Sequence, residues 1–252
     1  MKFPEKYKPT VKALLEMESQ IVNGNLSQLS VRCSQWTLPP KVLLLSILVS
    51  SSLNLFLPNC FCVRLKKKIM ILCFLSLMKI IQCRIALRRT PNTKILSSFG
   101  PEWFGFSEAE YRFRRPLHHA SSGTDWITMN LWDRLDRRFP NIKCTLISNE
   151  YADDELLSSE LLLITRLMWQ RRIRSMTLDH DIVPILVFSL MGTQHVRILQ
   201  AHFDGSTLIR LKSKTLDLTT RDDEALDLLG QWYCSDPVGN TMWDEPVRTG
   251  TV

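Results

Sequence analysis

The side chains best suited to acid–base or metal chemistry are five histidines, all of which lie after residue 117. His180 lies between Asp179 and Asp181, a pattern that suits a small cation site but is more typical of a solvated turn. His195 and His202 are seven residues apart on one expected strand, so their side chains are expected on opposite faces. The histidines therefore do not predict a metal site or a catalytic triad.

The seven cysteines give no sign of a metal site or a disulfide framework. Cys60 and Cys62 are separated by one residue, whereas a zinc site needs a wider gap and a second pair of ligands. An odd number of scattered cysteines is not typical of a small disulfide-bonded domain. We therefore expect reduced thiols in an intracellular protein. The sequence also contains no Gly-x-Ser-x-Gly, P-loop or dinucleotide-binding motif.

Five elements are expected in succession near the end of the chain. A helix over 154–174 begins with acidic residues and ends with arginines, which suits the helix dipole. Strands over 182–189, 195–203 and 207–212 follow, separated by Gly-containing turns that favour a β-meander. A second helix is expected over 222–233.

This order of elements resembles the core of the PD-(D/E)xK nuclease-like domains. The resemblance implies an Asp at the start of one strand and a Glu-x-Lys on the next, which together hold Mg²⁺ and steady the attacking water. Asp181 precedes the strand 182–189, Gln200 and His202 stand in place of Glu-x-Lys, and Glu160 is a candidate extra ligand. Gln is not an anionic ligand and His is not a Lys, so the resemblance implies an inactive enzyme.

A second resemblance, to uncharacterised fungal proteins, lies in two short stretches of the same region. These are Asp181–Ser189 and Val196–Gly205, within a similar segment that covers 101–245. This resemblance implies no activity, but it indicates that residues 41–98 are foreign to the original protein.

The charge is divided sharply along the chain. Residues 1–100 carry 15 Lys and Arg but only 3 Asp and Glu, and no acidic residue lies between Glu18 and Glu102. The net charge of +7 therefore comes from the first 100 residues, which argues against a nucleic-acid-binding role for the later domain. Arginines near the end of the helix 154–174 are expected on a solvated face that suits the helix dipole: Arg166, Arg171, Arg172 and Arg174.

The acid-free segment 41–98 allows three interpretations. Residues 42–62 are apolar and long enough to span a bilayer, with the basic cluster Arg64–Lys68 on the cytoplasmic side. The same composition is expected from translation of an AT-rich non-coding stretch, that is, a gene-model artefact. A buried core helix is the third interpretation, although Ser50–Ser52 and Pro58 suit it poorly.

Four further elements are expected outside this core. Helices are predicted over 8–23, 107–113 and 128–139, and a strand over 143–147. The helix 8–23 is amphipathic, with these residues at helical spacing: Val11, Leu14, Leu15, Glu18 and Val22.

The predicted fold class is α+β, with a core of helix, three-stranded β-meander and helix, extra N-terminal helices and an apolar N-terminal insert. The expected divisions are an N-terminal helix and polar linker (1–40), the apolar segment (41–98), a globular domain (99–235) and a polar tail (236–252). The core is expected to centre on these residues: Leu161, Ile164, Ile185, Val187, Ile198, Leu199 and Leu226.

The leading hypothesis is a non-catalytic interaction module without a cofactor, which binds an unknown protein partner. The first alternative is a divergent, inactive PD-(D/E)xK-like nuclease, for which Mg²⁺ is the expected metal. The second is a single-pass membrane-anchored protein with its span at 42–62. The expected location is cytoplasmic or nuclear, or membrane-associated if 42–62 spans a bilayer.

Overall fold

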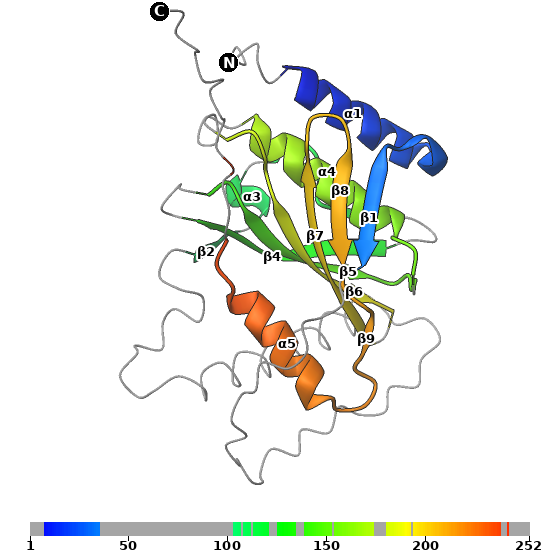
Figure 1. The fold of residues 1–252 in the computed structure, drawn as a ribbon, viewed down its shortest axis with the longest axis vertical. Helices are drawn as coiled ribbons and strands as arrows, with labels where there is room; N and C mark the ends of the chain where they lie inside the picture. Colours follow the sequence, from blue (N-terminus) through cyan, green and yellow to red (C-terminus); the bar gives the residue numbers. More distant parts are fainter. Residues whose placement is uncertain are drawn as a thin grey trace, which may run out of the picture.

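The structure is a computed structural model that describes residues 8–35, 103–106, 108–111, 113–120, 125–134, 139–152, 154–173, 180–192, 194–237 and 241. They form one mixed β-sheet with helices on both of its faces (Figure 1). The helical elements are α1 (Lys8–Val22), the 3-10 helix η2 (Leu26–Gln28), α3 (Glu108–Tyr111), α4 (Ser158–Arg172) and α5 (Asp223–Cys234). The strands are β1 (Val31–Gln35), β2 (Trp103–Phe106), β3 (His118–Ala120), β4 (Asp125–Arg134), β5 (Ile142–Ser148), β6 (Ile185–Met191), β7 (His195–Phe203), β8 (Leu208–Lys212) and β9 (Leu216–Asp217).

The sheet has nine strands among the described residues, and its order is β1-β8-β7-β6-β5-β4-β2. Strand β3 also pairs with β4, and β9 also pairs with β7. The pairs β1–β8 and β5–β6 are parallel, and the other pairs are antiparallel. Helix α4 connects β5 to β6, as the crossover between parallel neighbours requires.

The predicted fold class, a helix–meander–helix core, is therefore wrong. The three strands of the expected meander are present as β6, β7 and β8, but they lie inside a much larger mixed sheet. Strand β1 pairs with β8 in the register Val31↔Leu208, so part of the N-terminal segment belongs to the same sheet. Pairing between residues so far apart leaves no local pattern in the sequence.

The predicted helix 128–139 is also wrong, because β4 covers most of it as a strand. The pairing of β4 with β5 is irregular between Met129 and Trp132, and Asn130 has a positive φ of 49°. Such a β-bulge shifts the alternation of side chains by one residue. Met129 and Trp132, three residues apart, therefore both pack on the side of α5, which is the spacing of a helix rather than of a strand.

Helices α1 and α4 cover one face of the sheet and α5 covers the other (Figure 1). The side of α1 and α4 holds Leu161, Ile164, Ile185, Val187 and Leu199 of the predicted core, and all five are buried. The other two predicted core residues, Ile198 and Leu226, are also buried, but they lie on the side of α5. The single predicted core is therefore two apolar layers, one on each face of the sheet.

Local sequence accounts well for α5. The carboxylate of Asp222 accepts a hydrogen bond from the backbone N–H of Ala225 at 3.0 Å, which caps the first turn. The buried residues Leu226, Leu229 and Tyr233 recur at intervals of three or four, so they form one apolar stripe against the sheet.

In the described part of the chain, no helix is both long enough and apolar enough to cross a bilayer. The predicted span at 42–62 lies outside the described residues.

Candidate functional site

The structure does not bring the four candidate metal-site residues together. Gln200 and His202 alternate along β7 with Leu199 and Ala201, which are in the apolar layer on the side of α1 and α4. Gln200 and His202 therefore lie on the opposite side of the sheet. Glu160 lies at the start of α4, and its carboxylate is fully buried against Arg197 on the α4 side.

Asp181 and His202 have different neighbours: Thr241 contacts Asp181, and Asp204 lies near His202. The backbone N–H of Asp181 donates to the carbonyl of Thr241 at 2.9 Å, before the paired part of β6 begins. Partial burial of the His202 imidazole lowers its pKa, and the nearby carboxylate of Asp204 offsets part of this effect. Within the described ranges, no three His, Cys, Asp or Glu side chains are grouped so that they could hold a metal ion.

The most deeply buried charges form an ion pair between β7 and α4. Arg197 Nε and Nη2 donate to the two carboxylate oxygens of Glu160 at 2.8 and 2.6 Å, and both side chains are fully buried. Arg197 Nη2 also donates to the carbonyl of Glu155 at 2.8 Å, and the Glu160 carboxylate accepts from the N–H of Leu157 at 2.9 Å. This pair fastens the loop before α4 to the sheet.

The same interactions explain why α4 begins later than predicted. The expected start at Asp154 lies in a loop, where the Lys212 ammonium contacts the Asp154 carboxylate at 3.2 Å. Because the carbonyl of Glu155 accepts from Arg197, the segment wraps around the ion pair and the helix begins at Ser158.

A second buried ion pair joins α4 to β4. The guanidinium of Arg171 donates to both carboxylate oxygens of Asp133, with Nη2 at 2.7 Å from Oδ1, and it also contacts the Tyr111 hydroxyl. Arg171 is only 1% exposed, and Arg172 is also buried. The prediction of a solvated face is therefore wrong for Arg171 and Arg172: Arg171 points to Asp133 on β4, and Arg172 donates to the carbonyl of His180. Arg174 lies outside the described residues.

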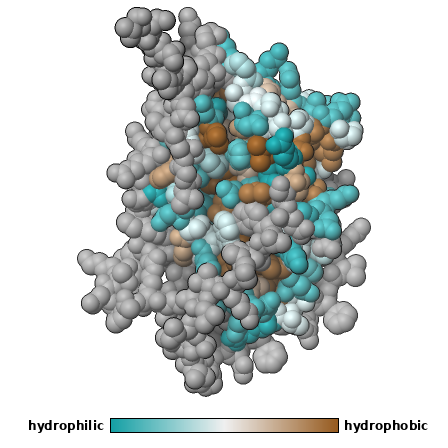
Figure 2. Space-filling view, in the orientation of Figure 1, coloured by the Kyte–Doolittle hydropathy of each residue, from teal (hydrophilic) through white to brown (hydrophobic). Residues whose placement is uncertain are grey.

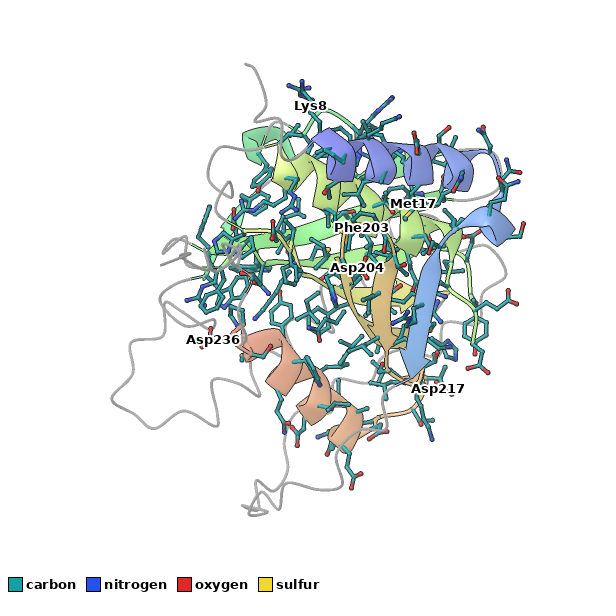
Figure 3. All side chains as sticks on the ribbon, turned by 45° about the horizontal axis from the view of Figure 1, so that its top comes forward. Lys8, Met17, Phe203, Asp204, Asp217 and Asp236 are labelled. Carbon is teal, nitrogen blue, oxygen red and sulfur yellow. The ribbon has the colours of Figure 1, made fainter. Side chains whose placement is uncertain are left out.

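Helix α1 is fastened to α4 by Glu18. Its carboxylate accepts from Arg166 Nε and from Trp169 Nε1, each at 2.9 Å. Figure 3 shows Met17 on the underside of α1, towards Phe203 at the end of β7, and both side chains are buried. The N-terminal helix is thus held by a polar contact to α4 and by apolar contacts to the sheet.

Lys143 on β5 is a further buried charge, on the side of α5. Its ammonium donates to the carbonyls of Tyr233 and Ser235 at the end of α5, and it lies 4.1 Å from the centre of the Trp103 ring. Burial lowers the pKa of Lys143 to about 8, and the carboxylate of Asp236 offsets part of this effect. The cation suits the negative end of the helix dipole, so its role here is to hold the C-terminus of α5.

Each of these buried charges contacts other groups of the same chain, and each contact ties two elements together. We therefore assign these buried charges a role in holding the fold together. The exposed apolar side chains lie elsewhere, mainly near the start of the chain.

The exposed apolar side chains are concentrated in α1 and η2. Leu15, Val22 and Leu26 are 40%, 61% and 38% exposed, and Tyr151 is the other large exposed apolar side chain among the described residues. The residues of α1 that are buried are instead Leu14, Met17, Glu18 and Ile21. The predicted apolar stripe of this helix was therefore partly wrong, since it included Leu15 and Val22.

Strand β1 follows η2 directly and lies at the edge of the sheet (Figure 1). Its backbone pairs with β8 on one side, and its other side has no partner strand among the described residues. Figure 2 shows apolar side chains gathered over the end of α1, in the same part of the view. We call this surface the β1 edge and define it by Val31–Gln35, Leu15, Val22 and Leu26.

The sequence does not predict the β1 edge, for two reasons. Residues 25–38 carry many Ser, Gln and Asn side chains, which hid the strand 31–35. The exposure of Leu15 and Val22 depends on which flank of α1 meets α4, and helical spacing alone does not determine that. The only available signal was that Leu15 and Val22 are seven residues apart, and so lie on one side of the helix.

No family model matches this chain, and comparisons with curated proteins and with solved structures also found no match.

Proposed function

We propose that this protein is a non-catalytic protein-binding domain and that the β1 edge is its binding surface. One observation carries the proposal: three of the four large exposed apolar side chains in the described residues belong to the α1–η2 segment that leads into the edge strand β1. An edge strand offers backbone N–H and C=O groups to a partner strand, and apolar side chains beside it add area and specificity.

The alternative, an inactive nuclease-like domain, has less support from the geometry. Glu160 would have to leave Arg197, which would then be a buried cation without its carboxylate partner. Gln200 and His202 lie on the other side of the sheet from Glu160, so one metal ion would not reach all three residues.

The expected location is intracellular, with reduced thiols. If residues 42–62 span a bilayer, the protein is anchored to a membrane instead. Carbonate extraction of membranes that contain the full chain separates these cases: an anchored chain stays in the pellet, and a chain without a span is released.

Site-specific photo-cross-linking tests the proposed surface. A benzophenone amino acid at position 22 lies on the β1 edge, and the same amino acid at position 151 is a matched control, since Tyr151 is also apolar and exposed. We expect discrete protein adducts in cells from position 22 and not from position 151. Equal labelling at both positions, or no adduct from position 22, would refute the proposal.

A further inference from the structure

We propose that the partner at the β1 edge is a second copy of this chain. In this dimer the two β1 strands pair in antiparallel fashion across a two-fold axis, and the exposed apolar side chains of α1 and η2 meet across the same axis. The inference rests on the proposed function, because it names the partner of the same surface.

The backbone of β1 is suited to accept another strand. Natural edge strands are usually protected by Pro, by Lys or by other charged residues. The strand Val31–Gln35 contains no Pro, no Lys and no acidic residue, and Arg32 is its single charge. Apart from Arg32, nothing in its sequence therefore opposes the addition of a strand.

The sequence of β1 is compatible with pairing to itself. In an antiparallel pair centred on Cys33, position 31 lies opposite position 35 of the other copy, and Cys33 lies opposite Cys33. Arg32 lies opposite position 34, so the two arginines do not face each other, and like charges directly opposite would be destabilising. A two-fold axis of this kind produces a closed, self-complementary interface.

The two-fold axis also brings the two α1 helices to the same face of the combined sheet. The axis is perpendicular to the sheet, so it keeps each face on its own side, and α1 lies on the α4 face in both copies. Leu15 and Val22 are seven residues apart and lie on one side of α1, an arrangement that suits packing between two helices.

Both parts of the surface are needed for a stable dimer. A specific interface buries about 1,000 Å² or more, and a pair of five-residue strands alone is a small contact. The side chains of Leu15, Val22 and Leu26 supply the additional apolar area, and their burial would remove an exposed apolar cluster from water.

Sedimentation velocity of the full chain at several concentrations tests the proposal. We expect the average mass to rise from the chain mass of 29.2 kDa towards twice that value as the concentration increases. The double variant Leu15→Glu/Val22→Glu places carboxylates in the interface, and we expect its dimer dissociation constant to rise about tenfold or more. The matched variant Tyr151→Glu should dimerise like the original chain. All three substituted positions are exposed, so the fold should be retained.

Cross-linking at Cys33 provides a second measurement. Cys33 is exposed, and residues directly opposite in an antiparallel pair have Cα atoms about 5 Å apart. A short bis-maleimide should therefore join two copies of the original chain, and Cys33→Ser should abolish that product.

The outcomes separate this inference from the proposed function. A chain that stays monomeric at all concentrations, or a dimer that neither the double variant nor Cys33→Ser affects, overturns the second-copy inference. If the position-22 photo-cross-linker then labels a different protein, the β1 edge still binds a partner and the proposed function stands. If it labels nothing, both fail.

Discussion

Removing one member of the buried pair Arg197–Glu160 should destabilise the fold strongly. In Arg197→Met, the fully buried Glu160 carboxylate loses both guanidinium hydrogen bonds, at 2.8 and 2.6 Å, and keeps the N–H of Leu157. An uncompensated buried charge of this kind costs about 3–5 kcal/mol. The carbonyl of Glu155 also loses its donor, which adds to the loss.

Replacing both members together should recover much of that loss. In Arg197→Met/Glu160→Leu no charge is left buried, and an apolar pair of similar volume often matches a buried ion pair in stability. The remaining cost is about 1–2 kcal/mol, because the N–H of Leu157 and the carbonyl of Glu155 lose their partners.

Urea denaturation of the original chain, both single variants and the double variant measures the coupling free energy. We expect the loss in the double variant to be smaller than the sum of the two single losses by about 2 kcal/mol or more. Additive losses, or a loss below about 1 kcal/mol for Arg197→Met, would show that the pair is not buried as described.

Three further predictions concern other contacts. Burial outweighs the contacts of the Lys143 ammonium and lowers its pKa to about 8, so on balance the buried charge opposes folding below that pH. The unfolding free energy of the original chain should therefore rise relative to that of Lys143→Met by roughly 3 kcal/mol between pH 8 and the usual Lys pKa of 10.5. If the difference in unfolding free energy between the two chains does not change over this pH range, Lys143 is not buried as described. Leu161→Ala should lower the unfolding free energy, measured by heat or urea, by about 2–5 kcal/mol. The control Leu15→Ala, at an exposed position, should lower it by less than about 0.5 kcal/mol. Equal losses in the two variants would place Leu161 outside the core. Glu18→Ala should lower the unfolding free energy by about 2–3 kcal/mol, since it removes the contacts to α4. The control Glu16→Ala, in an exposed pair with Lys12, should lower it by less than about 0.5 kcal/mol. Similar losses in the two variants would mean that Glu18 does not hold α1 against α4.

Among the described residues, the sequence predicts the four α-helices and the strands β5 to β8, but it predicts neither the other five strands nor how the elements assemble. The strands 195–203 and 207–212 and the helices 8–23 and 222–233 were placed within a residue or two, because their apolar periods and turns are local. The helix prediction at 128–139 failed because the bulge in β4 disturbs the two-residue period. Local patterns also carry no information on the pairing of Val31 with Leu208, which sets the edge of the sheet.

The candidate site could be predicted even less well. The sequence suggests Glu160 as a metal ligand because a carboxylate on a helix suits that chemistry, but its charge is matched by Arg197 from a strand far along the chain. Arg171 was expected in solvent because it follows the helix dipole rule, and its partner Asp133 lies in the segment that was predicted as a helix. A charge therefore indicates function only when its partners in space are known.

Hydrogen–deuterium exchange of the β1 backbone tests whether two copies of the chain pair through this strand. The exchange of residues 31–35 is measured in the full chain at low and high protein concentration, with α5 (Asp223–Cys234) as the internal control. We expect exchange in β1 to slow at the concentration at which dimers form, because its outward N–H groups gain partners, while exchange in α5 is unchanged. Exchange in β1 that does not change as the protein associates would contradict the claim that two copies of the chain pair through the β1 edge.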